Sequence, residues 1–157
     1  MLSEKEIKVF AKIAKKIKNP KAGLPQGIFD AISQIVPFPA CEIVVVNKNQ
    51  EILLTWREDK WWNGWHIPGG LMRFGETFQD RLDKTAKNEL GVGIKSFKFL
   101  FVENYDTELR GHSVACVFLC QLKGNPKQGK FFKHMPKDII KQHMVVWKKI
   151  HKIMDKS

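Results

Sequence analysis

The segment of residues 68–92 constrains the fold of this chain more than any other part of the sequence. It opens with a Gly-Gly turn ending at Gly70, carries Glu76 six residues later, and closes in a Glu-Leu-Gly-Val run at 89–92. Between these ends an apolar side chain recurs at every fourth position: Phe78, Leu82, Ala86 and Leu90. This spacing predicts an amphipathic helix over roughly 76–90 that packs on a core with its apolar face.

The other face of this predicted helix is polar. The spacing turns four side chains away from the core: Lys84, Thr85, Asn88 and Glu89. A carboxylate presented beside a glycine turn is suited to holding a hard cation next to a phosphate. An ordinary surface helix after a tight turn would explain the periodicity, but it would not explain the glycine and glutamate spacing at both ends.

The spacing resembles the Nudix box, which is a glycine, five residues, a glutamate, seven residues, then an Arg-Glu-apolar-x-Glu-Glu-x-Gly-apolar run. The matching positions are Gly70, Glu76, Lys84, Glu89 and Gly91. Lys84 stands at the arginine position, and Thr85 and Asn88 replace two of the three clustered glutamates. We predict that Glu76 pairs with Lys84 and braces the loop against the helix. The resemblance implies an α/β fold of the Nudix type, an α/β/α sandwich around a mixed sheet.

A box that has lost most of its carboxylates is similar to that of the GDP-mannose mannosyl hydrolase branch of the Nudix family. That branch implies hydrolysis of a nucleotide sugar with one Mg2+, for which Mn2+ can substitute. Attack is at the sugar C1 carbon, which releases nucleoside diphosphate and free sugar. The metal ligands that the resemblance implies are the carbonyl of Gly69, the carboxylate of Glu89 and the side chain of Gln128.

The resemblance also implies a strand acid and a strand-end arginine at the site. Glu42 and Arg57 occupy these places. Arg57 would bind a phosphate through its planar fork of donors. Glu42 would orient a sugar hydroxyl or a charged neighbour. Leu71 stands where a second arginine is expected, so Arg73, two residues on, is the candidate for a second phosphate contact.

The general base is the weakest part of the match. In the related enzymes a histidine follows the metal-binding glutamine, but Gly129 follows Gln128 here. His134, in the same late loop, is the leading candidate, and His66 and His112 are alternatives, since any histidine can titrate near neutral pH. The two remaining histidines, His143 and His151, lie on a predicted C-terminal helix and are expected to be structural or surface groups. His143 is on the apolar side of that helix.

Substrate contacts are also expected from the loop before Gly69. Trp61, Trp62 and Trp65 crowd this loop. We interpret Trp65 as a core residue, whereas Trp62 or its neighbour Trp61 could stack on a base or a sugar ring. His66 is either a substrate contact or a packed strand residue.

At 157 residues, 43% of them hydrophobic, the chain is long enough for one sizeable core. We predict an N-terminal helical extension at 1–36 and a Nudix domain at 37–157. The extension contains an amphipathic helix from Ser3 to Lys18 and a second helix at about 26–35. We expect it to pack either on the core or on a partner subunit. The remaining predicted elements are strands near 41–47, 51–57, 95–103 and 112–122, and a helix at 137–154.

The net charge of +11 predicts attraction to anions, whether nucleotide phosphates, RNA or acidic membrane surfaces. Nucleic acid is not favoured as a partner, because no RNA-binding motif is present. The sequence has no apolar run of 18 residues, so no membrane partner is expected. Three cysteines without metal-binding spacing indicate buried thiols in a reducing cytoplasm. A homodimer is one candidate assembly.

Three functions are compatible with these patterns. The leading one is a Mg2+-dependent nucleotide-sugar hydrolase of the GDP-mannose type. The second is a Nudix pyrophosphohydrolase that acts on another nucleoside diphosphate derivative. The third is a catalytically silent Nudix-fold module that binds a nucleotide ligand or a partner.

Overall fold

The computed structural model of this chain describes residues 1–107 and 111–155. Its helices are α1 (Glu4–Ala14), the short 3-10 turn η1 (Pro20–Ala22), α2 (Gln26–Ser33), α3 (Phe78–Leu90) and α4 (His143–Met154). Its strands are β1 (Phe38–Val44), β2 (Ile52–Glu58), β3 (Asn63–His66), β4 (Gly69–Leu71), β5 (Ile94–Thr107), β6 (Gly111–Leu122) and β7 (Lys130–Phe132).

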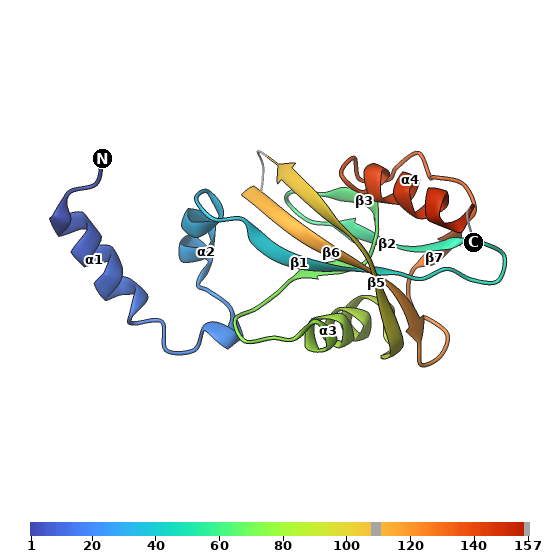
Figure 1. Cartoon of the computed structure of the whole chain (residues 1–157), viewed down its shortest axis with the longest axis horizontal. Helices are drawn as coiled ribbons and strands as arrows, with labels where there is room; N and C mark the ends of the chain where they lie inside the picture. Colours follow the sequence, from blue (N-terminus) through green and yellow to red (C-terminus); the bar gives the residue numbers. More distant parts are fainter. Residues whose placement is uncertain (108–110, 156–157) are drawn as a thin grey trace.

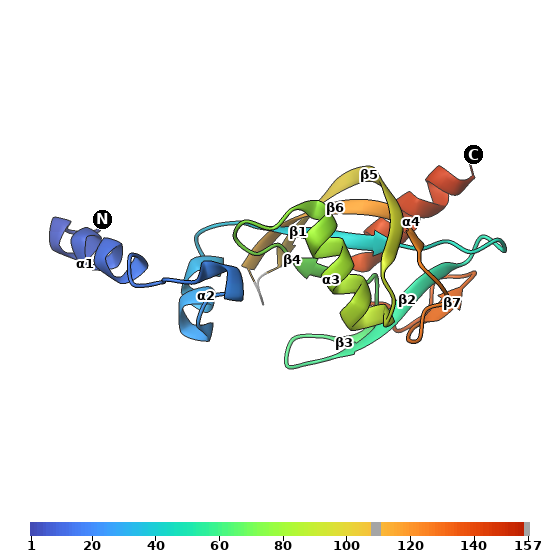
Figure 2. The same cartoon turned by 90° about the horizontal axis from the view of Figure 1, so that it is seen from below.

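The strands form two sheets between two helices (Figure 1). The four-stranded sheet has the order β4-β1-β6-β5, in which β1 and β6 are parallel and the other pairs antiparallel. The three-stranded sheet has the order β3-β2-β7 and is antiparallel. α3 crosses one side of the layered sheets and α4 lies on the other, as the turned view also shows (Figure 2). The predicted α/β/α sandwich around a mixed sheet is therefore confirmed.

Two apolar clusters hold the layers together. The first joins α3 to the sheets through buried residues that include Leu82, Ala86, Leu90, Ile43 and Leu53. The second joins α4 to the opposite side through Val146, Trp147, Ile150, Val44 and Leu54. Since residues of β1 and of β2 alternate between the two clusters, the period-two pattern of each strand is used on both faces.

The backbone geometry of the box segment requires glycine at two positions. α3 begins after Thr77, which forms a capping box with Asp80, and ends at Gly91, whose φ of 69° is left-handed and favours glycine. A side chain at Gly70 would come within 3.2 Å of the Thr85 hydroxyl, so glycine lets β4 approach α3 closely. Thr85, predicted to face away from the core, is instead buried at this contact.

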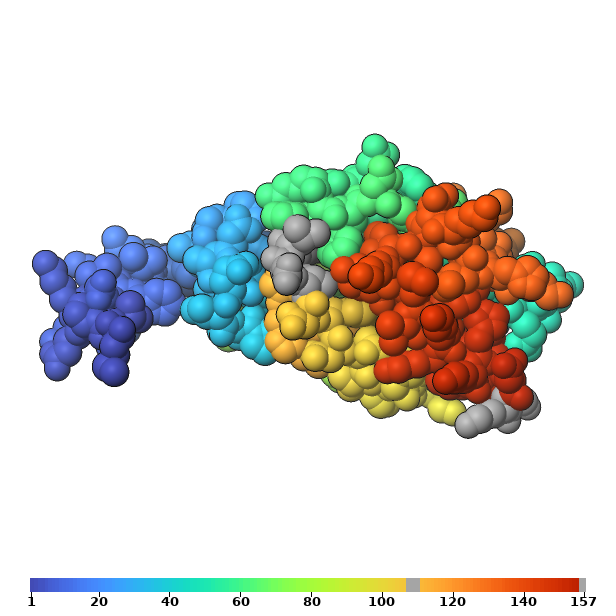
Figure 3. All heavy atoms as spheres, turned by 90° about the horizontal axis from the view of Figure 1, so that it is seen from above, coloured from blue at the N-terminus to red at the C-terminus, as the bar shows by residue number. Residues whose placement is uncertain are grey.

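The N-terminal extension has two unlike parts. The C-terminal end of α2 packs against Gly111, where an added side chain would meet the Ser33 carbonyl at 2.2 Å, and Phe29 stacks on Phe38 of β1. α1 has no buried residue and projects away from the body (Figures 1 and 3). It ends at Ala14, earlier than the predicted Lys18, because the chain tightens into turns there.

The C-terminal helix is also shorter than predicted. It begins at His143 and not at residue 137. Trp65 of β3 donates a backbone hydrogen bond to Asp138 and accepts one from Ile140. The backbone of 138–140 is therefore bonded to the sheet and is not free to form the first turn of a helix.

Candidate active site

Two adjoining pockets form a cleft over the edge of the sheets. An outer pocket is lined by residues of β2, by the C-terminal end of α3 and by Gln128 of the late loop. An inner pocket extends toward β1, β5 and the start of α4. Arg57, His66 and Gly69 line both pockets, so the two are continuous at these residues.

Glu89 is the carboxylate of the outer pocket that survives from the box cluster. Its Oε2 accepts a hydrogen bond from the Thr55 hydroxyl at 3.1 Å and lies 3.3 Å from Nε2 of His66. Its Oε1 accepts from the Gly69 N–H at 3.4 Å. Burial raises the pKa of Glu89, while the bonds from Thr55 and Gly69 oppose this change. The carboxylate therefore faces only neutral donors at close range.

Gly69 directs its peptide group toward Glu89. In the segment 68–72, the even-numbered residues form the backbone hydrogen bonds to β1. The Pro68 carbonyl accepts from the Ile43 N–H, and the Met72 N–H donates to the Pro39 carbonyl. Because peptide groups alternate in an antiparallel pair, those of Gly69 point to the opposite side, toward the outer pocket. An added side chain at Gly69 would also press on Glu42 at 3.1 Å.

The donors of the outer pocket fit a magnesium ion. The carboxylate of Glu89, the carbonyl of Gly69 and the amide of Gln128 are oxygen ligands, which Mg2+ prefers. Across residues 1–107 and 111–155 no group of three or more His, Cys, Asp or Glu side chains could hold a metal. A site of this kind suits an ion that keeps several waters and shares substrate phosphates, not one enclosed by protein carboxylates.

Arg57 stands between the two pockets at the end of β2. Its Nε pairs with the Asp59 carboxylate at 2.6 Å, and about a third of each side chain is exposed. Asp59 also accepts hydrogen bonds from the backbone of Trp61 and Trp62, which fixes the turn that carries Trp62 into the inner pocket. The guanidinium is thereby anchored at one end while the rest of its fork remains available to an anion.

The inner pocket contains a buried acid. Glu42 is 4% exposed, and burial raises the pKa of its carboxyl to about 8, although the nearby Tyr105 hydroxyl acts in the opposite direction. Burial and the proximity of Glu42 raise the pKa of Tyr105 as well. At neutral pH both groups therefore carry a proton for most of the time in the free protein.

His143 lies behind this acid and is neutral. Its Nδ1 accepts a hydrogen bond from the Ile67 N–H at 3.3 Å, so the ring carries its proton on Nε2. Burial lowers the pKa of His143 to about 3, and His66 and Arg57 add to the effect. Glu42 Oε1 lies 3.8 Å from the same Nδ1, an approach that a protonated carboxyl tolerates.

The structure brings most of the predicted site residues together. The cleft contains Glu42, Arg57, Trp62, His66, Gly69, Gly70, Glu89, Gln128 and the alternative base His112. His66 is buried, its Nε2 lies 3.0 Å from the Thr55 hydroxyl, and burial lowers its pKa to about 4. His66 is therefore a packed strand residue that also lines the cleft, and its contact with a substrate stays a prediction.

Two predicted residues lie elsewhere. The Arg73 guanidinium donates to the Ala22 carbonyl at 2.8 Å, so its side chain binds the N-terminal extension and does not line the cleft. His134 is exposed after β7 and lines neither pocket. Conversely, His143, interpreted from the sequence as structural or surface, lines the inner pocket, as do Tyr105 and Gln142. The one sequence signal for His143 was a titratable side chain on the apolar stripe of its helix.

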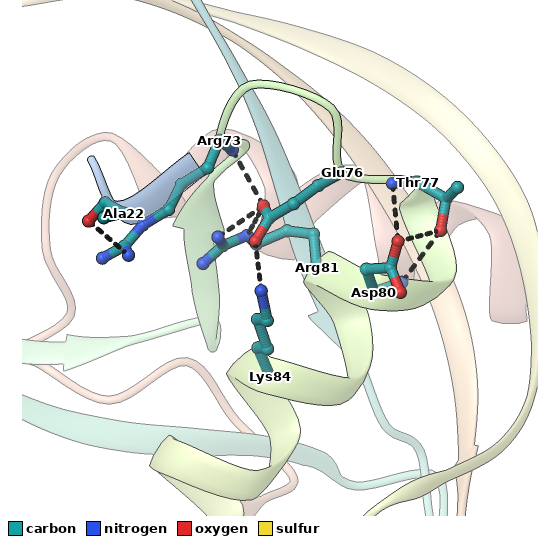
Figure 4. Close-up of polar contacts among 7 residues, drawn as sticks. All are labelled: Ala22, Arg73, Glu76, Thr77, Asp80, Arg81 and Lys84. Carbon is teal, nitrogen blue, oxygen red and sulfur yellow. Dashed lines mark hydrogen bonds and ion pairs between the residues drawn. The ribbon is translucent and has the colours of Figure 1, made fainter. Parts of the chain in front are cut away.

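The glutamate at the start of the box helix has a different environment (Figure 4). Glu76 accepts from Arg81, from Lys84 at 2.8 Å and from the Arg73 N–H at 2.8 Å. Its side chain is 7% exposed. Burial raises the pKa of Glu76, but these bonds outweigh it and bring the value to about 2. Glu76 braces the loop on α3, and the predicted pairing with Lys84 is confirmed.

Sequence comparison assigns this fold to a family. The family model described as NUDIX domain matches residues 37–153. The chain therefore belongs to the Nudix family, whose box lies at 70–92 in this sequence.

Two curated proteins share part of this domain. The low-salt glycan biosynthesis protein Agl8 of Haloferax volcanii is 34% identical over 91 residues, which are 56% of this chain and 58% of Agl8. The ADP-ribose pyrophosphatase of Methanocaldococcus jannaschii is 30% identical over 117 residues, which are 64% of this chain and 69% of that protein. The match thus spans less than two thirds of the length of Agl8.

Solved structures agree on the fold. The MutT NUDIX hydrolase of Burkholderia pseudomallei has a TM-score of 0.64 at 21% identity, covering 72% of this chain and 97% of that one. A MutT/nudix family protein of Enterococcus faecalis has a TM-score of 0.60 at 18% identity, covering 99% of this chain and 76% of that one. Within the residues that the structure describes, no helix is long and apolar enough to cross a membrane.

Proposed function

We propose that this protein is a Mg2+-dependent hydrolase of a nucleotide sugar of the GDP-mannose type, releasing nucleoside diphosphate and free sugar. The proposal rests on the division of the cleft into two pockets with different linings. The outer pocket has one box carboxylate, Glu89, beside the carbonyl of Gly69 and the amide of Gln128. The inner pocket is lined by buried neutral groups suited to a polyhydroxyl ligand.

The outer pocket would receive the diphosphate. Gly69, Glu89 and Gln128 would hold the metal, which when bound neutralises charge on the diphosphate leaving group. Arg57 would add a second, fixed source of positive charge at the boundary of the two pockets. Stabilising a leaving group in this way does not need the several carboxylates that hold several metals for attack at phosphorus.

The inner pocket would receive the sugar. Among the described residues, three buried polar atoms that lack a hydrogen bond of ordinary geometry belong to residues that line it: Glu42 Oε2, the Tyr105 hydroxyl and Gln142 Oε1. Glu42 and Tyr105 lie close enough to shift each other's pKa, so Gln142 Oε1 is the clearest of the three. Buried polar groups are nearly always paired, so unpaired ones that line a pocket favour a ligand with hydroxyl groups. Trp62 at the rim offers a flat apolar face to a base or a sugar ring.

The general base is assigned within the cleft and not to His134. His66 and His112 line the inner pocket and stay candidates, and His143 joins them. His66 and His143 are neutral at pH 7, because burial lowers their pKa to about 4 and about 3. Such weak bases would contribute modestly, so most of the rate would come from the electrostatic stabilisation supplied by the cation and Arg57.

The relatives support two substrate classes. The name of Agl8 refers to glycan biosynthesis, in keeping with a nucleotide sugar. The second relative is an ADP-ribose pyrophosphatase, which favours the second candidate, cleavage between the phosphates of a nucleoside diphosphate derivative. Both classes place a diphosphate on the metal and differ in the bond that breaks.

Phosphorus NMR of the products distinguishes these functions. The protein is incubated with Mg2+ and GDP-mannose, other nucleotide sugars and ADP-ribose in turn. The proposal predicts GDP and free mannose from GDP-mannose. GMP and mannose 1-phosphate would establish the pyrophosphohydrolase instead. If no substrate is consumed but one binds by calorimetry, the protein is a silent binding module.

A further inference from the structure

The N-terminal helix α1 presents an apolar surface that the body of the protein does not cover. Ile7, Phe10 and Ile13 are 54%, 57% and 44% exposed. The space-filling view shows this end of the chain standing clear of the rest of the molecule (Figure 3). An exposed apolar stripe of this kind marks an interaction site.

The opposite face of α1 is basic. At 100° per residue, the apolar side chains Ile7, Phe10 and Ile13 are centred on one side of the helix and the lysines on the other. The lysines of this face are Lys5, Lys8 and Lys12, and Lys15 and Lys16 follow at the C-terminal end of the helix. Of these, only Lys8 has an ion pair within the described part of the chain, with Glu4 at 3.7 Å.

α1 has a well-capped N-terminus but is too short to be stable on its own. Ser3 and Glu6 make a reciprocal capping box at its start. An 11-residue helix is nevertheless short for independent stability in water, since isolated helices below about 12–15 residues are marginal. Its apolar face therefore needs a partner.

We propose that α1 binds the surface of an anionic lipid bilayer, with Ile7, Phe10 and Ile13 inserted at the level of the headgroups. Lysines on the polar face of such a helix are attracted to acidic lipids, which is the charge pattern of helices that lie in the membrane interface. A second copy of the chain is a poorer occupant, because each copy carries a net charge of +11. Nucleic acid would attract the lysines but would leave Phe10 in water.

Membrane binding through α1 would also orient the cleft. The chain continues from α1 through η1 to α2, and the end of α2 packs on Gly111, which lines the inner pocket. Phe29 of α2 stacks on Phe38, another lining residue. The helix is thus attached at the end of the body that contains the inner pocket. The absence of a spanning helix does not bear on this, since a helix lying on a surface does not cross the bilayer.

Flotation of the full chain with lipid vesicles tests the proposal. The protein is mixed with phosphatidylcholine vesicles that contain phosphatidylserine, and with vesicles of phosphatidylcholine alone. The apolar variant carries Ile7→Ser and Phe10→Ser, and its control carries Phe74→Ser and Val145→Ser, which are also exposed. The charge variant carries Lys5→Gln and Lys12→Gln, and its control carries Lys148→Gln and Lys152→Gln on α4.

The wild type and both controls should float with the anionic vesicles, and high salt should weaken their binding. The charge variant should partition about tenfold or more weaker, given about 1 kcal/mol for each lysine near an acidic surface. The apolar variant should lose binding, with an unchanged thermal unfolding transition of the body. Failure of the wild type to float, or equal loss in the controls, would overturn the proposal. So would a dimer in solution that the apolar variant dissociates, or RNA binding that needs the lysines but not Phe10.

Discussion

Two glutamates of the box lie in opposite environments, Glu76 in the loop just before α3 and Glu89 in the last turn of that helix. At the start of the helix, Glu76 is enclosed by Arg81, Lys84 and a backbone N–H, and its pKa is brought down to about 2. At the other end, Glu89 has the Thr55 hydroxyl and the Gly69 N–H, and burial raises its pKa. Glu76 is ion-paired with two cationic side chains, whereas Glu89 forms no ion pair with a lysine or arginine among the described residues.

This difference separates the structural half of the box from the functional half. A carboxylate already bound to two cationic side chains has little affinity left for a metal, and it fixes the loop between β4 and α3 (Figure 4). A partly buried carboxylate whose hydrogen-bond donors are neutral is costly to ionise, and a bound cation would relieve that cost. The sequence predicted a pairing of Glu76 with Lys84, which is confirmed, and the role of Glu89 as a metal ligand stays a prediction.

The largest expected effect is on turnover at Glu89. Glu89→Gln keeps the shape of the side chain but removes the charge that would hold Mg2+. We expect a loss of about 1000-fold or more, since a catalytic metal contributes several kcal/mol of charge stabilisation. Rates of nucleotide-sugar hydrolysis measure this, with Glu76→Gln as the matched variant at the other end of the helix. Full Mg2+-dependent activity in Glu89→Gln would exclude a single metal on this residue.

Arg57 should come next, because it adjoins the Glu89 end of the helix. Arg57→Lys keeps the charge and loses the planar fork, so we expect turnover to fall about 10- to 1000-fold. Arg73→Lys is the control, since Arg73 binds the Ala22 carbonyl and lies outside the cleft. Steady-state rates equal to wild type in Arg57→Lys would remove Arg57 from the phosphate site.

Glu76 should act on stability. Glu76→Gln should lower the free energy of unfolding by about 1.5–3 kcal/mol, the range for hydrogen bonds to charged groups. Because the pKa of Glu76 is lowered from 4.5 to about 2, its contribution is present above about pH 4.5 and is lost as pH falls toward 2. Between about pH 4.5 and 2, the free energy of unfolding measured with urea should fall less in Glu76→Gln than in the wild type. An unchanged pH dependence would show that the ion pairs do not form in solution.

His134 should have the smallest effect. It is exposed and lines neither pocket, so His134→Gln should change turnover by less than about twofold, as surface substitutions generally do. Histidine-to-glutamine substitutions at His66 and His143 in the cleft provide the comparison. A large loss of turnover in His134→Gln alone would mean that the late loop closes over the site.

The elements were largely predictable because their determinants are local. The four-residue apolar spacing gave α3, and the box spacing gave the Glu76–Lys84 pair, which one loop and two helical turns bring together. The strands predicted near 41–47, 51–57, 95–103 and 112–122 correspond to β1, β2, β5 and β6, whereas β3, β4 and β7 were not predicted. Most of the cleft followed from the resemblance, because residues at strand ends and in the box occupy fixed places in the fold.

The errors concern side chains whose direction is set from far away in the sequence. Arg73 points to Ala22, 51 residues earlier, and no local pattern indicates that contact. His143 is held by the Ile67 N–H, 76 residues earlier, so periodicity placed it correctly on the apolar face but not in the cleft. The start of α4 was predicted too early, because Trp65 of β3 forms hydrogen bonds with the backbone of Asp138 and Ile140, just before the helix.

Metal binding without turnover tests the difference between the two ends of α3 most directly. Mn2+ can replace Mg2+ and is followed by electron paramagnetic resonance as it binds the purified protein. We predict that the wild type and Glu76→Gln bind a single Mn2+ with similar affinity, and that Glu89→Gln has no comparable Mn2+ site. Retained binding in Glu89→Gln, or loss of binding in a folded Glu76→Gln, would contradict it.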